Sequence, residues 1–211
     1  YVRVGNQVLA AAIVGCGGNA PTRASNADAM PGLSAGRCVQ IRKISDGSLI
    51  RAFHTGNGLE GNAVMSYAMI GSPSVYPAIG LAPASRAYLG DAMGRLWRID
   101  LRSANPNEWK MSIAWPLEDD DAADFYQIGR EISESPSVFV RESGKVGIVF
   151  GTGYAYRDDA GRPYILSLTD ELKLGQNNTL SYQAALVWKM PLRTTEELTG
   201  NVAVSYTHLT L

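Results

Sequence analysis

The sequence predicts an all-β fold made of repeated antiparallel hairpins, and three observations lead to this prediction. Short runs of alternating polar and apolar residues fill much of the chain, as is typical of half-buried strands. Turn signals that contain glycine separate these runs, as in Ser45-Asp46-Gly47. The same strand–loop–strand unit also recurs about every 60 residues.

The hairpins can be placed in order along the chain. Residues 38–44 alternate up to the turn at 45–47, and residues 49–53 return. Residues 86–90 and 95–101 form the second predicted hairpin, and residues 135–141 and 145–151 form the third. A further strand is predicted at 163–169, after the turn at 157–162. The only helix candidates are residues 121–131 and 194–198.

These hairpins are copies of one unit. Three apolar strands end in Gly15, Gly90 and Gly151, and each is followed by a loop, a Gly-Arg pair and an alternating strand. Ser-Pro-Ser-Val occurs twice, at 72–75 and 135–138, each time ahead of a strand that ends in glycine. Repeats of this length built from short strands are typical of β-propeller blades, which need neighbours to cover their faces.

We therefore predict a partial β-propeller over residues 1–204. About three blades are visible, whereas ring closure takes at least roughly four, so the ring is expected to be incomplete. Strands near residues 8–14 and 186–188 should be left uncovered at the two ends. Leu96, Trp97 and Ile99 should be sheltered in the middle blade, and tryptophans in general should pack between blades.

Composition excludes several classes of protein. The 211 residues carry a formal net charge of −1 and 18% charged residues, so charge does not favour nucleic acid or an anionic membrane surface as a partner. The longest apolar run near the start, residues 8–14, is far shorter than the roughly 20 residues of a membrane-spanning helix. Because the chain begins at Tyr1 rather than Met, we expect it to be a piece of a longer protein.

Two cysteines, Cys16 and Cys38, flank a polar loop. They are too few for a zinc site, since His54 and His208 are the only histidines. Two buried free thiols and a disulfide are the alternatives, and we favour the disulfide because the loop between them, rich in Pro, Asn and Ser, has little else to hold it. A disulfide implies an oxidising compartment.

Three glycine motifs resemble enzyme sites, but their surroundings predict loops. Gly15-Cys16-Gly17-Gly18-Asn19-Ala20 fits a dinucleotide-binding turn, yet prolines replace the required helix and no acidic residue follows at the expected distance. Residues 56–61 fit G-x-G-x-x-G and also lack a helix of sufficient length. Residues 32–36 fit the G-x-S-x-G nucleophile elbow without the strand before it or the helix after it. We therefore predict no enzyme.

The densest carboxylate cluster, residues 118–121 with Asp124, is contiguous and contains no glycine. Calcium loops alternate their oxygen ligands around a glycine, so we expect a solvated loop or the first turn of a short helix here rather than a metal site.

One hairpin carries a resemblance to a known family. Gly90-Asp91-Ala92-Met93-Gly94-Arg95-Leu96-Trp97-Arg98-Ile99-Asp100-Leu101 resembles the G-D-x-x-G-x-L-W-[RK]-x-D-L blade of the PilC/PilY family. Val149-Phe150-Gly151-Thr152-Gly153 resembles a further strand of that family, and residues 41–53 resemble one of its hairpins; both also recur in quinoprotein-like propellers. The resemblance covers residues 5–204.

The resemblance implies a C-terminal β-propeller of a bacterial type IV pilus biogenesis and tip-associated adhesion protein. It implies an envelope or extracellular location, pilus subunits and minor pilins as partners, and attachment to host or abiotic surfaces. Some members bind calcium in an Asp-rich propeller loop that regulates retraction. This sequence has no Asp-x-Asp/Asn-x-Asp-Gly loop, so no ligand residues follow.

Two alternative functions share the predicted blades. A quinoprotein-like dehydrogenase would need a quinone, a metal and a catalytic acid at the ring axis, and no such constellation can be assembled from the sequence. The other alternative is a generic cell-envelope scaffold. Separately, residues 204–211 resemble a translated sequencing adapter, as found at the ends of metagenomic gene fragments, so we expect residues 205–211, with His208, to be a non-native tail.

Overall fold

The computed structural model describes residues 1–17, 36–61, 63–77, 82–116, 130–153, 162–174, 180–193 and 202, and this part of the chain is all-β. It contains strands, one 3-10 turn and no α-helix. The strands are β1 (Val2–Val4), β2 (Gln7–Leu9), β3 (Ala11–Gly15), β4 (Val39–Lys43), β5 (Leu49–Phe53), β6 (Ser74–Tyr76), β7 (Arg86–Gly90), β8 (Leu96–Asp100), β9 (Lys110–Trp115), β10 (Ser137–Val140), β11 (Val146–Gly151), β12 (Tyr164–Leu174) and β13 (Leu180–Pro191).

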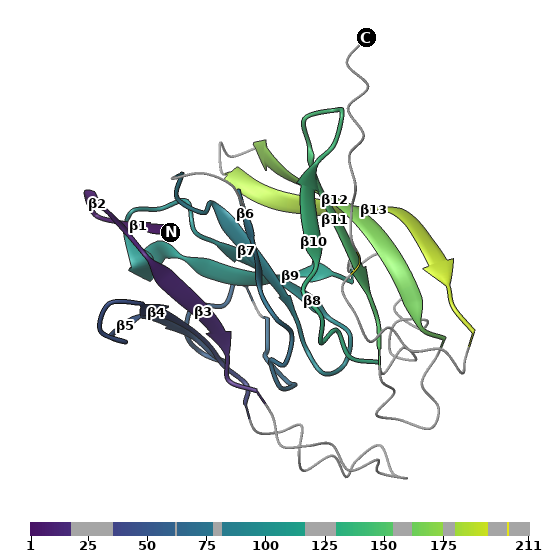
Figure 1. The fold of residues 1–211 in the computed structure, drawn as a ribbon, viewed down its shortest axis with the longest axis horizontal. Coiled ribbons are helices and arrows are strands. Elements are labelled where there is room, and N and C mark those ends of the chain that lie inside the picture. The colour runs from purple at the N-terminus through teal and green to yellow at the C-terminus, as the bar shows by residue number, and fades with distance from the viewer. Residues whose placement is uncertain are drawn as a thin grey trace.

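The strands form four antiparallel sheets (Figure 1). The hairpin β1–β2 precedes three larger sheets. These are the first sheet, β3–β4–β5, the second or middle sheet, β6–β7–β8–β9, and the third sheet, β10–β11–β12–β13. Strands that follow one another in the chain are neighbours in each sheet, so every sheet is an up-and-down meander. The described strands form no closed barrel or ring.

These findings confirm the all-β prediction and most of the predicted strands. β4, β5, β7, β8, β10 and β11 lie within the predicted ranges. β12 continues to Leu174, five residues past the predicted end at residue 169. The first large sheet has three strands among the described residues, whereas the other two large sheets have four each. The helix candidate at 121–131 lies almost wholly, and the one at 194–198 wholly, outside the described residues.

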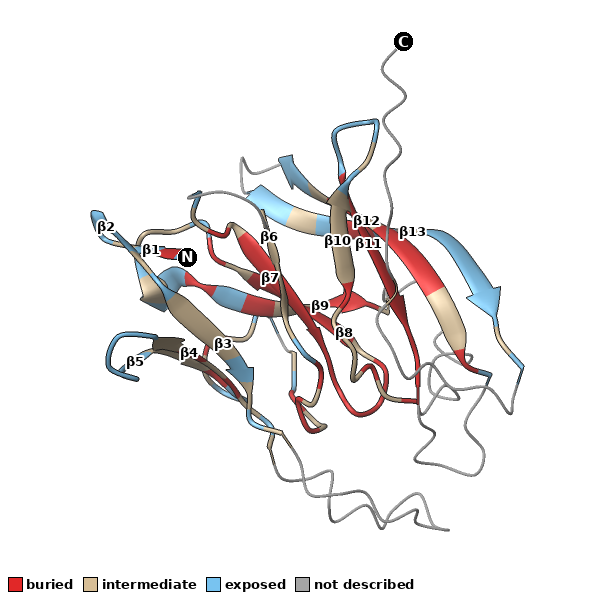
Figure 2. Ribbon diagram, viewed as in Figure 1, coloured by how far each residue is buried: buried red, intermediate tan, exposed pale blue. Residues whose placement is uncertain are grey.

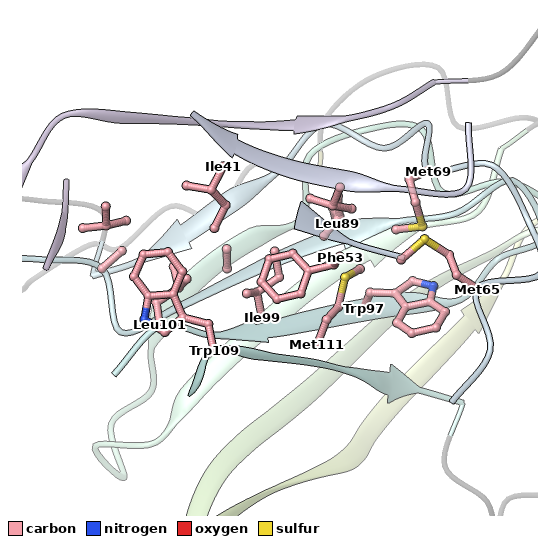
Figure 3. Close-up of a cluster of buried hydrophobic side chains, with 14 residues drawn as sticks. Ile41, Phe53, Met65, Met69, Leu89, Trp97, Ile99, Leu101, Trp109 and Met111 are labelled. Atoms are coloured by element: carbon pink, nitrogen blue, oxygen red, sulfur yellow. The ribbon is translucent and has the colours of Figure 1, made fainter. Parts of the chain in front are cut away.

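The first hydrophobic core lies between sheet β3–β5 and sheet β6–β9. Alternation along β7 and β8 turns Leu89, Trp97 and Ile99 to one face of the second sheet, where all three are fully buried. Ile41 of β4 and Phe53 of β5 meet them from the first sheet (Figure 3). The prediction that Leu96, Trp97 and Ile99 are sheltered in the middle of the molecule is therefore confirmed.

The second core lies between sheet β6–β9 and sheet β10–β13. Tyr88 and Leu96, on the opposite face of the middle sheet, pack with Ile148, Phe150 and Leu168 of the third sheet. The middle sheet thus buries both faces. Figure 2 shows the consequence, since buried residues are concentrated in β7, β8 and β11.

Bare glycine backbone lets neighbouring sheets approach closely at the ends of two strands. A Cβ added to Gly15, the last residue of β3, would overlap the carbonyl oxygen of Met69. A Cβ added to Gly90, the last residue of β7, would overlap the carbonyl oxygen of Ile132 in the same way. Met69 lies five residues before the first residue of β6, and Ile132 lies five residues before the first residue of β10. The sequence repeat is therefore a repeat of packing geometry as well.

The outer strands expose apolar side chains, as predicted. Val8 is 48% exposed and Val14 is 49% exposed at one end of the molecule. Val187 and Trp188 are each 43% exposed at the other end, in β13. Trp97, Trp109 and Trp115 are buried as expected for core residues, so Trp188 departs from the expectation for tryptophans. It lies on a strand with a sheet neighbour on one side only.

Candidate functional site

Two buried carboxylates at the contacts between sheets are the candidate functional groups of the described chain. Asp91 follows β7 and Asp170 lies in β12, and both are almost fully buried. A buried carboxylate requires strong donors, because an ion without partners is unstable away from water. The partners of each group therefore show whether it is free to act on another molecule or is used by the fold.

Asp91 organises the turn between β7 and β8. Its Oδ1 accepts hydrogen bonds from the backbone amides of Met93 at 2.9 Å and Arg95 at 3.0 Å. Its Oδ2 accepts from Trp97 Nε1 at 3.0 Å. Aspartate favours turns because its short side chain can accept from nearby amides in this way. Gly94, with φ of 93°, takes the one backbone conformation in this turn that other residues rarely adopt.

Burial raises the pKa of the Asp91 carboxyl above its ordinary value, because the charged form has lost contact with water. The hydrogen bonds from Trp97, Arg95 and Met93 act in the opposite direction, since they favour the carboxylate. A raised carboxyl pKa is also a feature of catalytic acids. Here, however, the three donors come from the same hairpin, and the arrangement is that of a turn anchored to a core indole.

Asp170 binds two arginines and a tyrosine of the neighbouring sheet. Arg98 Nη1 donates to Oδ1 at 2.7 Å, and Arg86 Nη1 donates to Oδ2 at 3.3 Å and to the backbone oxygen of Asp170 at 2.9 Å. The hydroxyl of Tyr88 donates to Oδ2 at 2.5 Å. Arg98 also donates through Nη2 to Ser112 Oγ at 2.8 Å, which connects β9 to the cluster. One carboxylate thus links β12 directly to β7 and β8, and through Arg98 to β9.

Tyr88 remains a hydrogen-bond donor throughout the ordinary pH range. Burial raises the pKa of its hydroxyl strongly, and the neighbouring charge of Asp170 raises it further. Arg86 acts in the opposite direction but does not reverse the shift. The phenol therefore stays protonated, and it remains the donor of the short Tyr88–Asp170 hydrogen bond.

Tyr182 of β13 also contacts the arginines that surround Asp170. Three guanidinium groups lie over its ring, those of Arg86 at 4.4 Å and of Arg98 and Arg102 at 4.8 Å from the ring centroid. A cation over an aromatic face is attracted to the ring quadrupole, most strongly when it is desolvated. Arg102 is also paired with Asp100, with Nη2 and Oδ2 at 2.6 Å. We call Asp170, Tyr182 and the arginines that contact them the inter-sheet cluster.

The inter-sheet cluster can hold two sheets together but shows no arrangement for turnover. Both oxygens of Asp170 accept from donors of the adjacent sheet, and each arginine is engaged by a carboxylate or an aromatic ring. A general acid or nucleophile has to reach a substrate atom within hydrogen-bond distance. The geometry instead matches a buried ion-pair network, in which Arg86 Nε, Arg98 Nε and the Tyr182 hydroxyl have no hydrogen-bond partner within the described part of the chain.

The structure joins Cys16 and Cys38 in a disulfide, with their Cα atoms 5.2 Å apart. Cys16 follows β3 and Cys38 precedes β4, and the amide of Cys16 donates to the carbonyl of Cys38 at 2.9 Å. The bridge therefore continues the β3–β4 ladder by one pair. It closes the chain between two residues that are 22 positions apart in the sequence.

The glycine motifs have structural roles where the structure describes them. Gly15 ends β3, and Gly17 has φ of 69° in the segment that follows. In the motif at 56–61, the carbonyl of Gly58 accepts from the amide of Met111, and the amide of Glu60 donates to the carbonyl of Met111. That segment therefore runs along β9 as a connection between sheets.

Two of the motifs weighed from the sequence lie outside the described residues. These are residues 32–35 of the G-x-S-x-G pattern and the carboxylate cluster at 118–121 with Asp124. In the part of the chain that the structure describes, no three His, Cys, Asp or Glu side chains come together as a metal site would require. No helix within that same part has the length and hydrophobicity needed to span a membrane.

Sequence reasoning did not identify Asp170 or Tyr182. Asp170 falls one residue beyond the predicted end of its strand, and Tyr182 lies in β13 ahead of residues 186–188, the part of that strand that was predicted. The available signal was a pattern violation: in β7 and β8, Arg86, Arg98 and Asp100 stand at positions that alternate with buried apolar residues on a strand covered on both faces. Buried arginines imply a carboxylate partner elsewhere in the chain.

Comparisons with known proteins give a partial structural similarity. No known protein family is matched by this chain, and no curated protein sequence matches it. The structure is similar to that of the C-terminal domain of PilY1 from Pseudomonas aeruginosa, with a TM-score of 0.44 and 18% sequence identity. The similarity covers 67% of this chain and 32% of that domain, so the chain spans about a third of the length of the solved structure.

We expect Asp91→Ala to destabilise the protein by on the order of 3 kcal/mol, because it leaves two amides and the indole N–H of Trp97 without their acceptor. Asp46→Ala is the matched control. Asp46 accepts from the amide and hydroxyl of Ser48 in the β4–β5 turn but is exposed, so water can replace it. Urea unfolding followed by tryptophan fluorescence measures both, and equal losses would contradict the role of Asp91.

Asp170→Asn should lower the free energy of unfolding by about 3–5 kcal/mol, because it leaves Arg86 and Arg98 buried without their counter-ion. Glu171→Gln, one residue away, removes a solvent-accessible, half-buried partner of Lys145 and should change stability little. The same unfolding measurement compares the two variants. A stability loss in Glu171→Gln as large as that in Asp170→Asn would show that the inter-sheet cluster is not a special point of attachment.

Removing the disulfide should cost about 3 kcal/mol, the value expected for closing a loop of this length. The measurement compares oxidised protein, reduced protein and the double variant Cys16→Ser with Cys38→Ser in chemical denaturation. Reductant should lower the midpoint of the natural sequence and leave the double variant unchanged. Identical midpoints for the oxidised and reduced protein would contradict this expectation.

Proposed function

We propose that the chain is a propeller-type repeat region of a non-enzymatic type IV pilus biogenesis and adhesion protein of the PilC/PilY kind. The observation that carries the proposal is the segment from Gly90 to Leu101, whose motif residues each have a defined part in the structure. If the sequence resemblance were coincidental, the matching residues would not be expected to form one hairpin together with its contacts to both neighbouring sheets.

The motif residues divide into a turn and two contact faces. Gly90 gives the close approach to Ile132, and Asp91 and Gly94 form the turn. Trp97 faces the first sheet, Leu96 packs toward the third sheet, and Arg98 pairs with Asp170 of the third sheet. This division supports a blade that is covered on both sides by others of its kind.

The packing of the larger sheets also supports a propeller arrangement. Each is a meander of short strands, and successive sheets lie face to face around separate hydrophobic cores. The glycine contacts at Gly15 and Gly90 repeat from one sheet to the next. A ring of further sheets would be needed for closure, which agrees with a chain that spans part of a longer domain.

A structural rather than catalytic role is supported by the two buried carboxylates, since each is bound by donors of the chain itself. A bacterial envelope or extracellular location is supported by the disulfide, because such bridges persist in oxidising compartments. Pilus subunits and minor pilins are the partners proposed for this region, with a host or abiotic surface as the further target of attachment. Calcium is proposed only for the longer protein of which this region would be part.

The proposal is tested by binding of purified minor pilins to the immobilised, oxidised chain. We expect saturable binding that is lost when the chain is unfolded in urea and returns on refolding. An unrelated β-propeller of similar charge serves as the control surface. In parallel, the chain is mixed with pyrroloquinoline quinone and calcium and its absorbance spectrum is recorded. Absent pilin binding would overturn the pilus proposal, and a bound-quinone spectrum would favour the dehydrogenase alternative.

A further inference from the structure

The first sheet carries one strand fewer than the other two on a particular edge. In the second and third sheets, the strand that ends in glycine lies between two neighbours: β7 between β6 and β8, and β11 between β10 and β12. Its counterpart in the first sheet, β3, pairs with β4, and no strand pairs with its other edge within the described ranges. That edge is exposed to additional pairing.

We call β6 and β10 the inner strands of the second and third sheets. Their sequences and their pairing show which kind of strand would fit the open edge of β3. Both start at the second serine of a Ser-Pro-Ser-Val sequence and continue with an aromatic residue. Ser74 pairs with Tyr88, and Ser137 pairs with Val149. In both sheets the serine is opposite the residue two positions before the terminal glycine. The same position in β3 is Ile13.

The backbone of β3 is oriented to accept this strand. The amide of Ile44 donates to Ala10, and the amide of Cys16 donates to Cys38, so the even-numbered residues of this segment face β4. Hydrogen-bonded and non-hydrogen-bonded residues alternate in an antiparallel pair. Ala11 and Ile13 therefore direct their N–H and C=O groups away from β4, toward the open edge.

The inner strand of the second sheet is also linked to the start of the inner strand of the third sheet. Ser74 Oγ donates to the carbonyl of Pro136 at 2.5 Å, and Ser137 Oγ donates to the carbonyl of Val202. In the first case the serine reaches the backbone directly before β10, whereas Val202 follows β13 and belongs to no described strand. The corresponding acceptor for a strand on β3 is the carbonyl of Pro73, the counterpart of Pro136 in the second sheet.

We propose that the open edge of β3 is an acceptor site for an extended partner peptide of the sequence type Ser-Pro-Ser-Val-aromatic. The peptide adds antiparallel to β3, with its second serine opposite Ile13, its valine opposite Ala12 and its aromatic residue opposite Ala11. Main-chain hydrogen bonds to Ala11 and Ile13 hold it, as in other cases of strand addition. The hydroxyl of that serine donates to the carbonyl of Pro73.

The test uses the full chain and a nine-residue peptide with the sequence of residues 133–141, Ser-Glu-Ser-Pro-Ser-Val-Phe-Val-Arg. One variant of the peptide is N-methylated at the second serine of its Ser-Pro-Ser sequence, which corresponds to Ser137. The backbone N–H of this serine faces β3 in the proposed complex. The matched control is N-methylated at the adjacent valine, whose N–H points away from β3. Binding is measured by calorimetry, and the site is located by hydrogen exchange of the backbone amides.

We expect the unmodified peptide to bind and the serine-methylated peptide to bind about tenfold more weakly, as follows from one lost backbone hydrogen bond. The valine-methylated control should bind like the unmodified peptide. Exchange should slow at Ala11 and Ile13 and stay unchanged in β13. The proposal is overturned by absence of binding, by equal effects of the two methylations, or by protection confined to β11 or β13. Sedimentation showing that copies of the chain pair through β3, in place of the peptide, would also overturn it.

Discussion

Sheet-to-sheet packing in this chain depends on bare backbone at Gly15 and Gly90. A four-stranded meander has two apolar faces and cannot bury both alone, so its stability comes from the sheets beside it. At the strand ends the neighbouring chain approaches so closely that any side chain at these glycines would meet a carbonyl oxygen. This contact brings Met69 and Ile132, both fully buried, onto the adjacent sheet and starts the next inner strand a fixed distance away.

The two faces of the middle sheet contact their neighbouring sheets through different kinds of interaction. Toward the first sheet the contact is apolar, with Trp97, Ile99 and Leu89 against Ile41 and Phe53. Toward the third sheet, the apolar packing of the second hydrophobic core is combined with the inter-sheet cluster around Asp170. Apolar packing is tolerant of small shifts, whereas hydrogen bonds to a buried carboxylate require one alignment. The ionic contact therefore sets the register between sheets that the apolar contact leaves less constrained.

Local signals in the sequence were sufficient for most of the fold. Alternation and glycine turns located β4, β5, β7, β8, β10 and β11, and the glycine-ended repeat identified the unit of packing. Inference was weaker where a strand has no turn signal of its own. β9 was not predicted as a strand, and only residues 186–188 of β13 were. β13 is long and mostly exposed, with little of the apolar alternation that marks a half-buried strand. The partnership of Arg98 with Asp170 joins residues 72 positions apart, so no local pattern could have indicated it.

The disulfide between Cys16 and Cys38 has a consequence for how the chain tolerates change. It joins the end of β3 to the start of β4 directly, so the covalent path between these strands no longer passes through the residues in between. A backbone break in that interval would leave both strands attached to the same molecule. Insertions and deletions there would likewise leave the β3–β4 register intact, because the bridge and the ladder hold it. The covalent connection between β3 and β4 is thus independent of the length of the segment between the two cysteines.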